Sequence, residues 1–295
     1  MKTFNILLLF LFFILPDSYA QYGTFTREMR ILYTQENPFE RFEDGRPKVP
    51  DDLIQRMKQV SIEEAWGVLR RHRYNSQFVG NWYNLHPDQV FVGRAVTASF
   101  FPTRPDLDNV TEELGKKDNQ IGGQNSWVID TLQKDDVIVI DLFGKVENGT
   151  FAGDNLANSI AAKTGTGMVI NGGIRDLDGI FEIPNFNALV RGVDPTAIAN
   201  VTLMGINIPI RIDNVTVMPG DVVLARREGV IFIPPHLAKE VVESSEDIRL
   251  RDEFGHQRLR EGRYTPGQID GRWNDEIRAD FEQWKKDRAG QGEEK

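Results

Sequence analysis

Three residues stand out for the chemistry that their side chains could perform together. They are Asp154 and, after twenty intervening residues, the adjacent pair Arg175 and Asp176. An arginine can hold a carboxylate through two parallel hydrogen bonds, which a lysine cannot imitate. An aspartate can bind a hard cation such as magnesium, whose remaining ligands are often waters. These residue types would suit a site for a carboxylate ligand beside a divalent cation, provided that the fold brings them together.

The spacing between these residues predicts that they meet. Residues 155–163 are mostly helix formers, and Asp154 stands before them as an N-cap candidate. Such a helix carries the chain away by ~15 Å, at about 1.5 Å per residue. After a glycine-rich turn, the β-rich residues 168–172 return by about 16 Å, at ~3.3 Å per residue. Arg175 and Asp176 should therefore finish close to Asp154 and to the free amides at the helix N-terminus, which favour an anion.

A purely structural explanation also exists for each residue. Asp154 can serve only as an N-cap, and residues 171–172 only as a tight turn. Arg175 and Asp176 can form a solvated pair that binds no ligand. Caps and turns account for most residues of these types, so the spacing alone leaves both explanations open.

Other motifs that carry chemistry are incomplete in this sequence. The segment that begins at Gly165 lacks the third glycine of a dinucleotide-binding loop, because Ile170 stands in its place, and it follows a helix instead of a strand. No serine lies in a G-x-S-x-G elbow. Without cysteine, a zinc site would depend on four histidines that have no metal-ligand spacing. They are His72, His86, His236 and His256.

The N-terminus has the layout of a secretory signal peptide. Lys2 precedes an apolar block at residues 6–15, and small residues lead to a cleavage position after Ala20. The apolar block is shorter than the roughly 20 residues that a membrane-spanning helix needs. We therefore expect residues 1–20 to be removed as a signal peptide. The mature chain would have no stable membrane anchor and would be secreted or periplasmic.

The charge and composition of the chain argue against nucleic acid as a partner. The formal net charge is −9, and no basic run interrupts the acidic background, so no nucleic acid is expected as a partner. The chain has no cysteine, and its 295 residues are enough to bury a core that needs no disulfide.

The alternation of helix and strand patterns predicts an α/β fold with a mixed sheet. Residues 21–60 form an N-terminal arm that is extended to about residue 50, and residues 61–246 form the main domain. Residues 103–123 are interpreted as an insertion or long loop. Helices are expected at residues 51–60, 61–71, 124–132 and 236–246, and strands at 90–101, 136–142, 188–190, 208–212, 222–225 and 231–233. Ser61 and Glu64 have the spacing of a capping box at the start of the second helix. The last two strands are expected to pair across a turn at residues 227–229.

Residues 247–295 have a charged helical pattern and form a C-terminal extension. Two interpretations are open. The extension is a solvated appendage, or it is an arm whose Trp273 and Trp284 pack on a neighbouring subunit.

The spacing of Asp154, Arg175 and Asp176 resembles the signature of the RraA-like family. It is most similar to the class II pyruvate aldolase branch, the 4-hydroxy-4-methyl-2-oxoglutarate aldolases that also act as oxaloacetate decarboxylases. Further similar segments lie at residues 92–97, 189–192, 219–223 and 229–234. The resemblance implies a swivelling β/β/α three-layer fold of the RraA-like type with a mixed sheet. It also implies a homotrimer or homohexamer with active sites near subunit boundaries.

The resemblance further implies a lyase that cleaves a carbon–carbon bond of a small 2-oxo acid by retro-aldol reaction or decarboxylation. Arg175 would bind the substrate carboxylate, and Asp176 would carry magnesium, or manganese. Pyruvate would be released through an enolate that the metal stabilises. Asp154 would orient water on the metal or the surrounding loop.

Backbone groups at the start of the helix would complete the substrate site. In this interpretation the amides of Asn155 and Leu156 help to bind the carboxylate, and Gly153 lies beside it.

Two alternatives remain open from the sequence. One is a non-catalytic, oligomeric binding or regulatory protein of the RraA-like type, although regulators of this family lack an intact Arg-Asp pair and this chain keeps both residues. The other is a lyase of the same fold that acts on a sugar acid. One departure from the family pattern is Arg226, which stands where relatives usually have aspartate.

Overall fold

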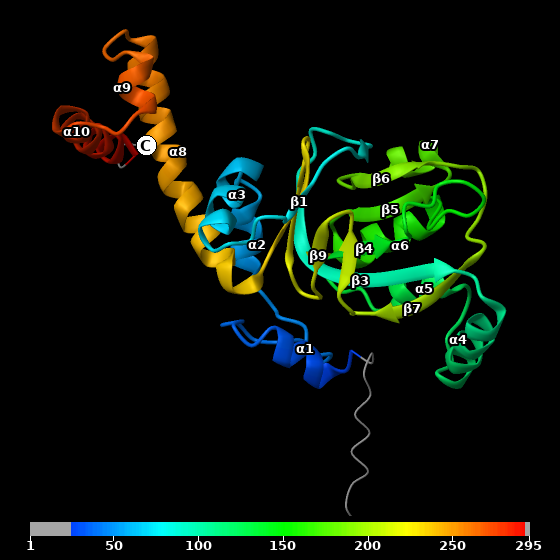
Figure 1. Ribbon diagram of the computed structural model, residues 1–295. Coiled ribbons are helices and arrows are strands. Elements are labelled where there is room, and N and C mark those ends of the chain that lie inside the picture. The colour runs from blue at the N-terminus through cyan, green and yellow to red at the C-terminus, as the bar shows by residue number, and fades with distance from the viewer. Residues whose placement is uncertain (1–24, 293–295) are drawn as a thin grey trace, which may run out of the picture.

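The computed structural model describes residues 25–292, so the expected signal peptide at residues 1–20 lies outside the described residues. Most strands of this part belong to one nine-stranded mixed sheet (Figure 1), with the order β1-β11-β10-β3-β4-β5-β6-β2 and with β7 paired to β3. Strands β8 and β9 form a separate hairpin. The strands are β1 (Phe78–Val79), β2 (Tyr83–Asn84), β3 (Phe91–Pro102), β4 (Asp136–Asp141), β5 (Met168–Ile174), β6 (Ala188–Val193), β7 (Val201–Ile206), β8 (Ile210–Ile212), β9 (Val215–Val217), β10 (Val222–Arg226) and β11 (Gly229–Ile233).

Ten α-helices and one short 3-10 helix accompany these strands in the described part of the chain. They are α1 (Arg27–Tyr33), α2 (Asp51–Met57), α3 (Ile62–Arg71), α4 (Pro105–Lys117), α5 (Gln124–Asp130), α6 (Asp154–Thr164), α7 (Leu177–Phe181), η1 (Pro235–Leu237), α8 (Ala238–Arg260), α9 (Pro266–Asp270) and α10 (Asp275–Gly292). No helix among residues 25–292 is both long and apolar enough to cross a membrane.

Strands β3, β4, β5 and β6 are parallel and form the centre of the sheet. Their side chains are apolar on both faces, as expected for a sheet that is covered on both sides. In β4, for example, Ile138 and Ile140 belong to one buried cluster, whereas Val137 and Val139 belong to another. This alternation explains why residues 136–142 form a nearly continuous apolar run in the sequence.

The two clusters lie on opposite faces of the sheet and define three layers. The β8–β9 hairpin packs its apolar side chains on one face, and α5, α6 and α7 cover the other. A third cluster joins α2, α3 and α8 to β10 and β11. The order of hairpin, sheet and helices is the β/β/α arrangement that the resemblance to the RraA-like family implied.

Several local predictions are confirmed. Ser61 caps α3, and its side chain and that of Glu64 form the expected capping box. Strands β10 and β11 pair as an antiparallel hairpin, as predicted. Both features depend on residues that are close in the sequence, so local patterns were sufficient to find them.

Two segments differ from the expectation. The N-terminal arm is not wholly extended, because α1 forms within it after Thr26, whose side chain caps the helix. Residues 103–123 are not a long loop, because 13 of them form α4. Pro105 at the first turn, acidic residues near the start and lysines at the end all favour this helix, and these signals outweigh the polar composition that suggested a loop.

The C-terminal extension is helical, as expected, and its aromatic residues form a core of their own. Helix α8 runs away from the sheet and carries α9 and α10 at its far end (Figure 1). Phe254, Trp273 and Trp284 pack against one another there in a small separate core. Trp273 is buried in this core and Trp284 is half-buried, so the chain itself supplies most of the packing of Trp273. Packing of the extension on a neighbouring subunit stays a prediction.

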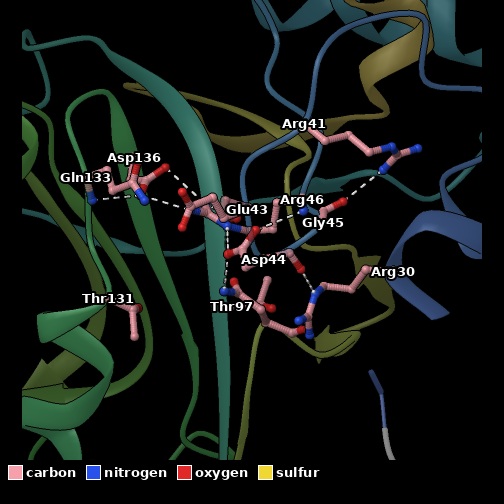
Figure 2. A network of polar contacts seen from close by, with 12 residues as sticks. Arg30, Arg41, Glu43, Asp44, Gly45, Arg46, Thr97, Thr131, Gln133 and Asp136 are labelled. Carbon is pink, nitrogen blue, oxygen red and sulfur yellow. Dashed lines mark hydrogen bonds and ion pairs between the residues drawn. The ribbon is translucent and has the colours of Figure 1, made fainter. Parts of the chain in front are cut away.

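A buried ion pair attaches the N-terminal arm to the sheet (Figure 2). The Arg46 side chain has 1% of its surface exposed, and its Nη1 lies 3.0 Å from Oδ1 of Asp136, which is fully buried at the start of β4. Arg46 Nε donates to Asp44 Oδ2 at 2.7 Å. Burial lowers the pKa of Arg46, but the attraction of Asp136 and its hydrogen bonds raise that pKa by more, so the guanidinium remains charged.

We predict that Arg46→Met destabilises the protein by about 3–5 kcal/mol, because it leaves Asp136 as an unpaired buried carboxylate. Urea unfolding followed by circular dichroism measures this change. Arg104→Met is the matched control, since Arg104 pairs with Asp106 on the surface and its loss should leave the unfolding midpoint almost unchanged. Equal midpoints for the two variants would contradict the structural role of the buried pair.

Candidate active site

Two backbone hydrogen bonds bring the predicted site residues together. Phe151 N–H donates to the carbonyl of Gly173 at 2.8 Å, and Arg175 N–H donates to the carbonyl of Ala152 at 3.0 Å. The loop that leads into α6 therefore runs beside the end of β5. As the spacing predicted, the chain travels out along α6, turns at Gly165 and returns along β5.

The start of α6 differs by one residue from the expectation. The N-cap is Gly153, and Asp154 is the first residue of the helix, so the prediction of Asp154 as N-cap is wrong. The carboxylate still engages the first turn, because its Oδ1 accepts a hydrogen bond from Asn155 N–H at 2.7 Å. The Asn155 amide is therefore already bonded to Asp154, and Leu156 lies half-buried against the core.

Arg175 and Asp176 form an ion pair at the end of β5. Their side chains are 35% and 39% exposed, so both can reach solvent. Asp176 has φ of 54°, in the left-handed region, and it is the N-cap residue of the short helix α7. Aspartate tolerates this conformation better than most residues, but outside glycine it is uncommon and is often found at functional sites.

A glycine lies directly against each of the carboxylates of Asp176 and Asp154. A Cβ added at Gly153 would be 2.3 Å from Oδ2 of Asp176 and 2.9 Å from Cζ of Arg175. A Cβ added at Gly179, in α7, would be 2.9 Å from Oδ2 of Asp154. The backbone thus approaches the acidic groups closely, in space that a larger residue would fill.

The donor set at this position fits a hard cation with few protein ligands. Among residues 25–292 no three histidine, cysteine or acidic side chains are grouped to hold a metal ion. Magnesium is often held by one or two carboxylates, with waters completing its octahedral shell. The solvent-exposed carboxylate of Asp176, set beside a glycine, meets this requirement.

The structure also contains a cluster of polar side chains around Arg191 that the sequence did not predict as a site. Arg191 donates from Nε to Asn171 Oδ1 at 2.9 Å and from Nη2 to Asp213 Oδ2 at 2.8 Å. Asn171 in turn donates to Asp141 Oδ1 at 3.1 Å. Asp141, Asn171 and Asp213 line a cavity of about 220 Å³. Only the order of the strands could have revealed this cluster from the sequence. Strands β4, β5 and β6 are parallel, and ligands of α/β proteins often bind near the carboxyl ends of such strands.

Arg226, the departure from the family pattern, is located away from these groups. It ends β10, and its guanidinium donates to the carbonyl of Val60, before α3. The arginine therefore joins the hairpin to the chain before the main domain.

Comparison with known proteins agrees with this fold. A family model described as "RraA-like: Aldolase/RraA" matches residues 60–232, and the chain belongs to this family. The 4-hydroxy-4-methyl-2-oxoglutarate aldolase of Thermus thermophilus is 26% identical over 144 residues, which cover 49% of this chain and 76% of that protein. The distant relatives of the chain therefore include a protein named as an aldolase, which is a lyase.

Two further proteins are similar. Protein DlpA of Legionella pneumophila is 33% identical over 126 residues, but this match spans 42% of the present chain and 20% of DlpA. The crystal structure of Streptomyces coelicolor RraAS2, described as an unusual member of the RNase ES inhibitor RraA protein family, superposes with a TM-score of 0.61 at 23% identity. That match covers 72% of this chain and all of RraAS2, and it shows a common fold.

We predict that Gly153→Ala destabilises the protein by about 1–3 kcal/mol, because the new methyl group must displace the Arg175–Asp176 pair. Gly67→Ala is the matched control. Open space surrounds a Cβ at Gly67, within α3, so the same substitution should stabilise by roughly 0.5–1 kcal/mol. Urea unfolding of both variants measures the difference, and a stabilising Gly153→Ala would show that the close approach is not a real constraint.

Proposed function

We propose that the protein is a divalent-metal-dependent lyase that cleaves a carbon–carbon bond of a small 2-oxo acid and releases pyruvate. The observation that carries this proposal is the meeting of Asp154, Arg175 and Asp176 at the start of α6. Membership of the RraA-like family and the distant aldolase relatives support it.

Arg175 is the group that would bind the substrate carboxylate. Its guanidinium is part exposed and is paired with the neighbouring Asp176. An incoming carboxylate would replace Asp176 as its partner and would accept two parallel hydrogen bonds. This exchange of partners would at the same time release the Asp176 carboxylate.

The released Asp176 carboxylate is the group that would hold magnesium, or manganese. Such a cation would supply positive charge where negative charge develops on the 2-oxo oxygen. The carboxylate of Asp154, which lies beside Gly179, would accept hydrogen bonds from water molecules around the cation. The amide of Asn155 would remain bonded to Asp154 and would fix its orientation.

The reaction requires an electron pair to move toward the 2-oxo group of the substrate, next to the carboxylate that Arg175 would bind. In a retro-aldol cleavage the C3–C4 bond breaks, its electrons pass to the pyruvate fragment as an enolate, and the C4 hydroxyl gives its proton to a water molecule as the C4 carbonyl forms. A proton added at C3 then completes pyruvate. In a decarboxylation carbon dioxide leaves instead and the same enolate forms.

We predict that the purified protein with magnesium exchanges the methyl protons of pyruvate with solvent deuterium, because this exchange passes through the same enolate. Proton nuclear magnetic resonance of the pyruvate methyl signal measures the rate. Chelation should abolish the exchange. Arg175→Lys should slow it by roughly 100-fold, since an ammonium lacks the planar two-point contact, and Asp176→Asn should remove it.

Matched controls are available on the surface of α4. Arg104 and Asp106 form an exposed arginine–aspartate pair, so Arg104→Lys and Asp106→Asn should leave the exchange rate unchanged. If the wild-type protein binds magnesium by calorimetry but exchanges no deuterium, the result would favour the non-catalytic binding or regulatory alternative, or a lyase for a sugar acid.

We also propose that the chain is exported after removal of residues 1–20 and assembles as a homotrimer or homohexamer. The first proposal rests on the signal-peptide layout, and the second on membership of the RraA-like family. N-terminal sequencing of the native protein should begin at Gln21. Light scattering should give three or six times the chain mass, and a monomer would contradict the proposed assembly.

A further inference from the structure

A second cavity lies between the N-terminal arm and the β9–β11 region. Its volume is about 490 Å³, and its walls include Tyr33, Glu36, Tyr74, Asp221 and His236. The cavity contains none of the residues proposed for the lyase reaction. Its lining combines two aromatic rings with two carboxylates, and no lysine or arginine lines it.

Asp221 is the most unusual group in this cavity. The residue is 3% exposed, and its Oδ2 accepts one hydrogen bond, from Met218 N–H at 2.8 Å. Among the described residues no other side-chain hydrogen bond and no ion pair involves Asp221. Burial therefore raises the pKa of Asp221 to about 7, and the Met218 amide lowers it only in part. A buried carboxylate that lacks a positive partner is costly unless a ligand provides one.

The other titratable groups leave the cavity negative. His236 Nε2 lies 3.1 Å from Oε2 of Glu36 and 3.4 Å from the hydroxyl of Tyr74. Burial lowers the pKa of His236 by more than Glu36 raises it, so the imidazole is mainly neutral above pH 7. Burial raises the pKa of Tyr74, which keeps the phenol neutral. Above the pKa of Asp221, its carboxylate thus carries a negative charge that no cationic side chain of the lining balances.

We propose that this cavity binds a small organic ammonium ion. The ammonium group would donate a hydrogen bond to Asp221, and the rings of Tyr33 and Tyr74 would face its positive charge or its alkyl chain. A hydrated metal ion is the less suitable occupant, because the rings of Tyr33 and Tyr74 in the wall offer it no oxygen ligand other than a phenol, whereas they suit an alkyl chain or an ammonium group. The arm residues Tyr33 and Glu36 form part of the wall, so a ligand would also hold the arm against the domain.

The test uses n-butylammonium as the probe and n-butanol as its neutral counterpart, at pH 8.5. Met218 lines the cavity, and the chain has six methionines, so ¹³C-labelled methionine methyl groups report the position of binding. We expect n-butylammonium to shift the Met218 methyl signal, assigned with Met218→Leu. Its dissociation constant should be roughly 10- to 100-fold lower than that of n-butanol.

Asp221→Asn should weaken n-butylammonium binding by roughly 10- to 100-fold and leave n-butanol binding unchanged, since the amide oxygen can still accept from Met218 N–H. Asp252→Asn, which removes the same charge from a different cavity on α8, is the matched control and should bind as the wild type does. If Asp221→Asn does not fold, Glu36→Gln, at an exposed position, should weaken binding several-fold. Equal affinity for the two probes, or unchanged binding in the Asp221 and Glu36 variants, would overturn the proposal.

Discussion

The candidate active site depends on two backbone hydrogen bonds between the loop before α6 and the end of β5. They join Phe151 to Gly173 and Arg175 to Ala152, and they bring two segments more than twenty residues apart into contact. Because Gly153 has no Cβ, the loop can pass directly beside the ion pair of Arg175 and Asp176. The parallel strands and the crossover helix α6 determine where these segments end, so the fold of the sheet fixes the geometry of the site.

Much of this arrangement could be predicted from the sequence because it follows from local patterns and lengths. The rise of a helix and of a strand over known numbers of residues predicted that Arg175 would return to the start of α6. The capping box at Ser61 and Glu64 and the β10–β11 hairpin were also predicted correctly, since each is specified by neighbouring residues. The mixed sheet and the three layers followed from the alternation of elements and from the resemblance to the RraA-like family.

Other features depend on contacts between distant residues, which no local pattern specifies. The arm residue Arg46 reaches Asp136 across 90 positions, and its burial could not be read from a polar segment. The packing of Trp273 and Trp284 on Phe254 was not predicted, because Phe254 lies in a helix whose pattern is charged. The sequence could not distinguish Asp154 as the N-cap from Asp154 as the first helical residue, because the two positions differ by a single residue.

We propose that Arg175 and Asp176 exchange their mutual ion pair for a substrate carboxylate and a divalent cation. A crystal structure with magnesium and oxalate, which imitates the pyruvate enolate, would show whether this exchange occurs. We expect oxalate on the Arg175 guanidinium and the cation on the Asp176 carboxylate, with the ion pair separated. Oxalate bound elsewhere, or an intact Arg175–Asp176 pair with no cation at Asp176, would contradict it.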